Sequence, residues 1–267
     1  MPDNKPLLKV ENLAVEFTTD KGAVRAVEDI SFEVGAGEPV GIVGESGSGK
    51  SVTALTVLQL VPNPPGRITN GRIELDGIDI LSKSQSEMRR IRGDVASMIF
   101  QEPMTALNPV FTIGNQMVEV IRVHRKVSKK EALASAVNML ETVNIPNPAK
   151  CVTQHPHELS GGMRQRVMIA MALSCDPKLL IADEPTTALD VTVQAQVLDE
   201  IHRQQEERNM GMILITHDLG VVAETCKRVV VMYKGEIVEI AETKELFRNP
   251  QHPYTQKLLD SVLTLRD

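Results

Sequence analysis

The chain has few aromatic residues and an excess of acidic ones, and each property excludes a class of function. It contains five phenylalanines, two tyrosines and no tryptophan, too few rings for a surface that stacks single-stranded bases. The net charge is −6, from 35 acidic and 29 basic residues, which argues against a broad nucleic-acid-binding surface. We therefore expect no nucleic-acid partner.

Cysteine is also scarce, and long apolar runs are absent. Cys151, Cys175 and Cys226 lie far apart and form no Cys-x-x-Cys pair, as is typical of reduced, buried thiols in a cytosolic protein. The first residues do not have the pattern of a signal peptide. No apolar run approaches the roughly 18–20 residues that span a bilayer. Any association with a membrane is therefore expected to depend on a partner.

The spacing of apolar residues predicts an α/β fold. Segments with the pattern of strands fall in two blocks, at 8–17, 24–34, 39–43, 72–77 and 95–100, and again at 178–183, 212–216, 228–233 and 236–241. Single helices are expected at 51–60 and 192–207. Helical spacing fills the stretch 112–174, with apolar stripes at Ile113, Met117, Val120 and Ile121, at Leu133, Val137, Leu140 and Val143, and at Val167, Ala170, Met171 and Ser174.

These blocks predict one nucleotide-binding domain over residues 1–267. Two strand-rich lobes, 1–103 and 175–242, flank a helical insertion at 104–174, and a short helical tail follows at 243–267. No internal repeat or low-complexity stretch interrupts them.

A glycine-rich loop follows the apolar strand 39–43 and precedes a helix. It reads Gly-Glu-Ser-Gly-Ser-Gly-Lys-Ser and matches the phosphate-binding pattern G-x-x-x-x-G-K-[ST]. Glycines let the backbone wrap a β-phosphate with its N–H groups inward, where a Cβ would obstruct it. Lys50 would contact the β- and γ-oxygens, Ser51 would offer a hydroxyl to Mg²⁺, and the helix dipole favours the anion. The candidate residues are Gly44, Glu45, Ser46, Gly47, Ser48, Gly49, Lys50, Ser51 and Val52. This motif alone does not separate ATP from GTP.

Two adjacent acids end the apolar strand near residue 180. Burying Asp183 and Glu184 is costly unless they face a metal or a water-filled site. Asp183 is the expected Mg²⁺ partner, and Glu184, pointing to the other face of the strand, is expected to polarise the attacking water. A strand that simply emerges into a polar loop explains one acid better than two.

Ser160-Gly161-Gly162 precedes a predicted helix at 163–174. Ser160 can cap this helix, whose N-terminus is also an anion site. Considered without the other motifs, these three residues are best interpreted as an ordinary helix N-cap followed by glycines.

In this order, the motifs resemble those of the ATP-binding subunits of ABC transporters over nearly the whole chain. Residues 44–51 resemble Walker A, 179–184 resemble Walker B and 159–163 resemble the family signature. The resemblance implies the ABC ATPase fold, a P-loop (RecA-like) core with an N-terminal antiparallel β subdomain and an inserted α-helical subdomain. It also implies ATP and Mg²⁺ as ligands.

The same resemblance implies roles for further residues. Gln101 matches the Q-loop residue that senses Mg²⁺, His217 the switch histidine that holds the γ-phosphate, and Phe17 the aromatic that stacks on adenine. Asp190 belongs to the D-loop. The catalytic candidates are then Glu184, His217, Gln101 and Lys50, and the metal candidates are Ser51, Gln101 and Asp183. Two subunits would sandwich two ATP molecules, each also contacted by Ser160, Gly161 and Gly162 of the opposite subunit.

Longer runs resemble the dipeptide, oligopeptide and nickel importer branch. They are 100–109, 159–172, 182–192 and the segment His252-Pro253-Tyr254-Thr255. They are similar to the D-type ATPase of this branch, since the F-type paralogue more often has Gln where Met163 stands. D-type chains commonly carry a Cys-rich extension with an iron–sulfur cluster. The sequence ends at Asp267 without one, so no cluster is expected.

The resemblance implies an ATP-hydrolysing subunit that powers import of peptides or related small solutes. Its expected place is peripheral, on the cytoplasmic face of the inner membrane. The expected partners are a second, non-identical F-type ATPase, two transmembrane permease subunits and, indirectly, a solute-binding protein. One alternative is a soluble ABC-type ATPase not linked to transport, although such proteins usually carry coiled-coil insertions or fused cassettes. Another is a regulatory nucleotide-binding module without turnover, against which the intact Glu184 and His217 argue. Within the family, an exporter ATPase is disfavoured by the branch-specific runs.

Overall fold

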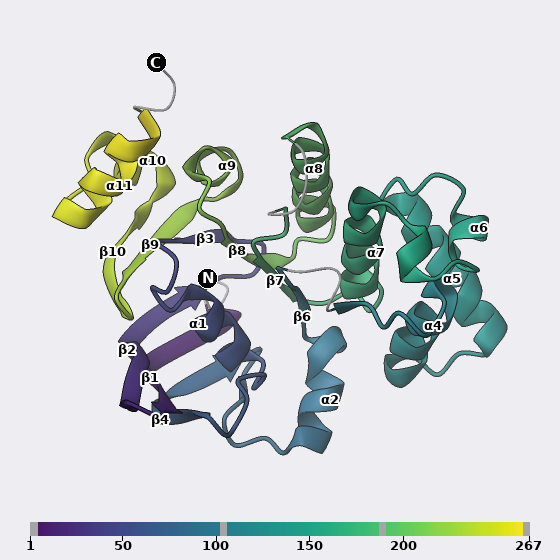
Figure 1. Cartoon of the computed structure of the whole chain (residues 1–267), viewed down its shortest axis with the longest axis horizontal. Coiled ribbons are helices and arrows are strands. Elements are labelled where there is room, and N and C mark those ends of the chain that lie inside the picture. Colours follow the sequence, from purple (N-terminus) through teal and green to yellow (C-terminus); the bar gives the residue numbers. More distant parts are fainter. Residues whose placement is uncertain (1–4, 102–105, 187–190, 264–267) are drawn as a thin grey trace. The chain divides into compact units, whose positions relative to one another are not determined.

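The computed structural model describes residues 5–101, 106–186 and 191–263 (Figure 1). The contacts divide the chain into two compact units. The first unit comprises residues 1–88 and 211–267, and the second comprises 89–210. The sequence-based lobe boundaries at 103, 174 and 242 differ from these limits and stay a prediction. No helix among the described residues combines the length and apolarity needed to cross a membrane.

The first unit contains an antiparallel sheet in the order β2-β1-β4-β5. Its strands are β1 (Leu8–Thr19), β2 (Gly22–Val34), β4 (Gly66–Leu75) and β5 (Ile78–Asp79). The first two strands were predicted. The prediction for β4 was wrong by six residues at its start, because Gly66 to Asn70 lack an apolar alternation but pair with β1 from Phe17 to Ala14.

A second sheet of this unit carries the phosphate loop. It consists of β3 (Pro39–Val43), β8 (Gly211–Ile215), β9 (Arg228–Tyr233) and β10 (Glu236–Glu242). β3 pairs in parallel with β8 and β9, and β10 pairs antiparallel with β9. Every residue of β3 and β8 is buried, as continuous apolar runs in parallel sheets require. Because Ile42 pairs with Ile215, the segments after both strands begin at the same sheet edge.

Among the described residues, four helices lie wholly within the first unit. They are α1 (Lys50–Val57), α9 (Leu219–Thr225), α10 (Thr243–Arg248) and α11 (Pro253–Leu263). α1 ends three residues before the predicted Leu60, because Gln59 adopts a left-handed φ of 49° and Leu60 N bonds back to Leu55 O. The sequence did not predict α9. Its cap is Asp218, whose carboxylate accepts from Gly220 N and Val221 N.

A further unpredicted helix, α2 (Gln85–Asp94), crosses the boundary between the units in the chain and kinks at Arg92 and Gly93. Ser84 N donates to the Glu87 carboxylate, and Glu87 N donates to Ser84 Oγ. This Ser-x-x-Glu pattern is the capping box that starts many helices. It is the feature of the sequence from which α2 could have been predicted.

The second unit contains the parallel pair β6 (Ala96–Ile99) and β7 (Leu179–Asp183). Its helices are α4 (Ile113–His124), α5 (Lys129–Thr142), α6 (Pro148–Cys151), the 3-10 turn η1 (Pro156–Glu158), α7 (Gly161–Leu173) and α8 (Val191–Glu207). The predicted helical stretch is therefore confirmed.

One residue of the predicted stripes, Leu133, was wrongly assigned to the buried face. Leu133 is 38% exposed, whereas Ala132, Ala136 and Leu140 form the buried face of α5. Residues spaced by four lie on one helix face, and two of the three are alanines, whose small side chains give a weak apolar signal. The pattern therefore favoured the larger Leu133.

Candidate nucleotide-binding site

The predicted phosphate loop connects the end of β3 to the start of α1. Gly44 has a φ of 150°, and a Cβ on it would lie 2.1 Å from Met232 O and 2.9 Å from Ser48 Oγ. Gly49, the N-cap of α1, is also left-handed, with a φ of 102°. These two positions require glycine for the packing of this chain itself.

Lys50 lies inside the loop and is only 6% exposed. Its Nζ donates to Gly44 O at 2.8 Å and to Glu45 O at 2.9 Å. A buried ammonium is costly unless compensated, and here two backbone carbonyls orient it across the loop. Phosphate oxygens entering the loop would supply the opposite charge. The role of Lys50 in binding phosphate stays a prediction.

The loop is also held from outside by two contacts. Gly235 N, in the turn between β9 and β10, donates to Ser48 O at 3.1 Å. Glu45 N donates to the hydroxyl of Tyr254 at 2.9 Å. Sequence reasoning treated Tyr254 only as part of a branch marker. It has no local signal as a site residue, because 209 positions separate it from Glu45.

Two further predicted residues lie in the same unit. His217 is exposed and comes two residues after the end of β8. Phe17 is half-buried in β1, where it pairs with Val24 and Gly66. A Cβ on Gly66 would lie 2.9 Å from Phe17 Cε1, so the ring rests against a residue without a side chain.

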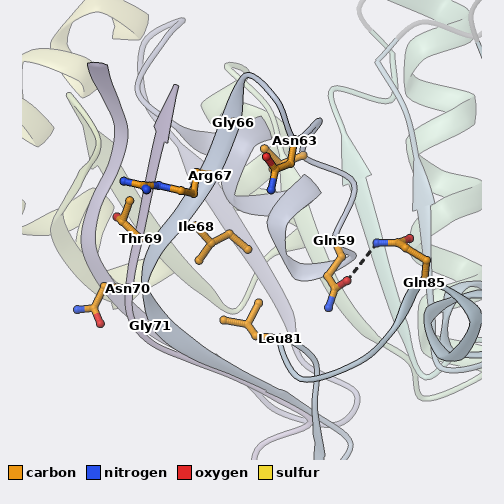
Figure 2. A pocket seen from close by; sticks show the side chains of 11 residues that line it. Gln59, Asn63, Gly66, Arg67, Ile68, Thr69, Asn70, Gly71, Leu81 and Gln85 are labelled. Carbon is orange, nitrogen blue, oxygen red and sulfur yellow. Dashed lines mark hydrogen bonds between the residues drawn. The ribbon is translucent and has the colours of Figure 1, made fainter. Parts of the chain in front are cut away.

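A cavity of about 510 Å³ lies beside β4, at the segment between α1 and that strand, and Figure 2 shows the side chains that line it. Gln59, Arg67, Asn70 and Gln85 contribute polar side chains to it, and Gln85 Nε2 donates to Gln59 Oε1. Its described lining contains no residue of the phosphate loop. We therefore do not count it as part of the nucleotide site.

The paired carboxylates lie in the second unit. Asp183, the last residue of β7, is 5% exposed. The prediction that Glu184 continues the strand was wrong, because Glu184 takes a left-handed φ of 45° after the strand ends. Such a conformation in a residue with a side chain costs about 1–3 kcal/mol and is common at active sites. Because of this conformation, Glu184 does not follow the alternation of side chains along β7.

Gln101 contacts this turn. Its Nε2 donates to Glu184 Oε2 at 3.2 Å, so the structure joins two residues that the sequence had assigned separately. The buried Gln165 of α7 donates its side-chain amide to Pro185 O. The signature helix is thus tied to the turn that carries Glu184.

The signature segment begins α7 as predicted. Ser160 is the N-cap, and its Oγ accepts from Met163 N at 3.3 Å, which confirms the capping interpretation. A Cβ on Gly161 would meet nothing within 4 Å, whereas one on Gly162 would lie 3.0 Å from Val193 Cγ1. The first N–H groups of a helix lack partners within it and favour anions.

The donors predicted for Mg²⁺ are oxygen atoms of Ser51, Gln101 and Asp183, which suit a hard cation. Among the described residues, no group of three or more His, Cys, Asp or Glu side chains could hold a metal. Mg²⁺ is usually bound by one or two carboxylates together with waters and substrate phosphates, and the predicted donors include one carboxylate, that of Asp183. Asp190 lies outside the described residues.

Comparison with known proteins identifies similar chains. The family model for the ABC transporter matches residues 27–187, and that for the oligopeptide/dipeptide transporter C-terminal region matches 238–267. A putative peptide import ATP-binding protein of Brucella abortus is 54% identical over 268 residues, covering 98% of this chain and 79% of the relative. The oligopeptide transport ATP-binding protein OppD of Bacillus subtilis is 53% identical over 259 residues, covering 97% and 72%.

Among solved structures, the ATP-binding cassette MJ0796 in a dimeric post-hydrolysis state bound to ADP and Pi superposes with a TM-score of 0.79. It is 26% identical and covers 88% of this chain and 98% of its own.

Proposed function

Because the chain belongs to the ABC transporter family, we propose how its residues divide the work of an ATPase that powers a peptide importer. The observation that carries the proposal is the buried Lys50, which two loop carbonyls orient inside a glycine-dependent phosphate loop. ATP is the substrate, and hydrolysis breaks its terminal P–O bond with water as the nucleophile.

The first unit binds the nucleotide. Residues 44–51 and Val52 surround the triphosphate with N–H groups and the Lys50 ammonium, and the dipole of α1 adds to the attraction. Phe17 stacks on the adenine ring. His217 holds the γ-phosphate from the neighbouring strand end.

The second unit supplies the hydrolytic groups. Glu184 orients and polarises the attacking water, and its hydrogen bond to Gln101 Nε2 at 3.2 Å holds the carboxylate in place. Asp183, Gln101 and Ser51 would hold Mg²⁺, and the ion would supply positive charge that offsets the negative charge of the phosphates.

The signature completes a site on another subunit. Ser160, Gly161 and Gly162 start α7, and they donate to the γ-phosphate of an ATP held by the second ATPase, with Asp190 near the same interface. Preorganised donors of this kind stabilise the charge of the transition state. Opening and closing of this dimer drives the permease.

The partners follow from the family. ATPase subunits of ABC importers dimerise and act on membrane permeases. For this chain we propose a non-identical F-type ATPase, two transmembrane subunits and, through them, a solute-binding protein. We place it peripherally on the cytoplasmic face of the inner membrane. Similarity to chains named for peptide import supports peptides as the solute.

The test is Glu184→Gln in the importer purified through this chain, with phosphate release and ATP binding both measured. We expect ATP affinity within about twofold of the unsubstituted chain, because Gln keeps the shape, and turnover at least about 100-fold lower, because the general base is lost. The control is Glu141→Gln, an exposed acid on α5, which leaves both unchanged. Turnover within tenfold of the original would contradict the role of Glu184.

A further inference from the structure

The C-terminal helix α11 begins beside the phosphate loop. Its second residue, Tyr254, is 8% exposed. The ring centroid of Tyr254 lies 4.2 Å from that of Tyr233, at the end of β9, with the rings tilted by 31°. Tyr254 is thus fixed against the sheet that carries the loop.

The hydroxyl of Tyr254 acts on one particular peptide group. The peptide that joins Gly44 to Glu45 donates its N–H to Tyr254 Oη at 2.9 Å. The carbonyl of the same peptide accepts from Lys50 Nζ at 2.8 Å. Because a peptide unit is planar, the tyrosine sets the direction of the carbonyl that orients the lysine. A chain of three groups therefore connects α11 to the phosphate-binding ammonium.

The start of α11 is itself anchored. Gln251 N and His252 N each donate to the carboxylate of Glu239 on β10 at 2.9 Å. Tyr254 N donates to His252 Nδ1 at 3.1 Å. Burial raises the pKa of the Tyr254 phenol, so the hydroxyl stays neutral at physiological pH. A neutral hydroxyl held in this way is a fixed acceptor for the Glu45 amide.

We propose that Tyr254 is a positioning residue for ATP: it holds the Gly44–Glu45 peptide so that Lys50 meets the phosphates. This inference rests on the proposed role of residues 44–51 and adds the C-terminal helix to that site. Since coupling between two events is reciprocal, bound ATP should also strengthen the docking of α11 on the loop.

The experiment compares two matched variants of the full chain, Tyr254→Phe and Tyr233→Phe. Both keep the ring pair, but only the first removes the acceptor of Glu45 N. Among the described residues, no hydrogen bond of the Tyr233 hydroxyl is found. ATP dissociation constants and the hydrogen exchange of the Glu45 amide are measured for each. Hydrogen exchange at Glu45 reports on this contact directly. A general loss of stability would instead speed exchange at many amides.

For Tyr254→Phe we expect ATP affinity to fall about three- to tenfold, the effect of one buried hydrogen bond, with faster exchange at Glu45. For Tyr233→Phe we expect affinity within twofold and unchanged exchange. Unchanged affinity in Tyr254→Phe, or an equal loss in both variants, overturns the inference.

A third variant separates this inference from the proposed function. Lys50→Ala should abolish measurable ATP binding. If it does, and Tyr254→Phe binds normally, only the role of Tyr254 fails. If Lys50→Ala binds ATP like the original chain, the proposed phosphate site fails, and the inference that rests on it fails too.

Discussion

Gly161→Ala separates stability from function at the signature. In this chain a Cβ on Gly161 meets nothing within 4 Å, and the residue is the first of α7. The substitution reduces the freedom of the unfolded chain without a clash, so the free energy of unfolding should rise by about 0.4–1 kcal/mol. Within the isolated chain, therefore, nothing described around position 161 would clash with the methyl group of an alanine.

The importer should respond in the opposite direction. If Gly161 faces the γ-phosphate bound by the second ATPase, a methyl group at this position obstructs the approach of the nucleotide. We expect phosphate release by the assembled importer to fall at least about tenfold. Removing a whole transition-state donor typically lowers turnover by about 10²–10³-fold, so this smaller loss fits a donor that is obstructed. ATP binding by the isolated chain should not change, because Gly161 belongs to the opposite site.

Urea unfolding of the isolated chain and phosphate release by the importer measure the two effects. Gly162→Ala is the comparison, since Val193 Cγ1 at 3.0 Å from its Cβ must move and should cancel the gain in stability. A stabilised Gly161→Ala chain whose importer hydrolyses ATP at the original rate would refute the sandwich role. A Gly161→Ala chain that unfolds at lower urea than the original would refute the argument from the free space around Gly161.

Two further predictions concern the loop glycines and the thiols. Gly44→Ala should destabilise the chain far more than Gly47→Ala in urea unfolding, because both have positive φ but only the first meets a carbonyl, Met232 O at 2.1 Å; equal midpoints would contradict this. Burial raises the pKa of Cys151 and Cys175 to about 11 and that of Cys226 to about 12, from 9.0, so alkylation at pH 8.5 should be slow in the folded chain and fast in urea. The unfolded thiols lose protons first, so their contribution to stability is complete below pH 9 and is lost as the pH rises through 11–12; rapid alkylation of the folded chain would contradict the burial.

The parts that the sequence predicted are those with strong local patterns. The five buried residues of β3 form a continuous apolar run that only a buried strand explains, and the phosphate loop follows it directly. Ser160 was predicted as a cap because the capping contact spans only three residues. In each case the pattern that carries the prediction lies within a short stretch of the chain.

The parts that were missed depend on distant contacts or on short elements. The contact of Tyr254 with Glu45 spans 209 positions, and no periodicity encodes it. The turn at Glu184 has a left-handed φ that a run of strand-forming residues conceals. α9 has seven residues, too few for two full turns of helical periodicity to be recognised. α1 was overextended because its end depends on the backbone of Gln59.

The central claim is that this ATPase acts within a membrane importer. The most direct test is to purify the Glu184→Gln chain, through a tag, from detergent-solubilised membranes with ATP and Mg²⁺, and to identify the accompanying chains by mass. The account predicts two multi-span membrane proteins and a second, non-identical ATPase in equal amounts. Recovery only from the soluble fraction, with nucleic acid or ribosomal proteins, would contradict it.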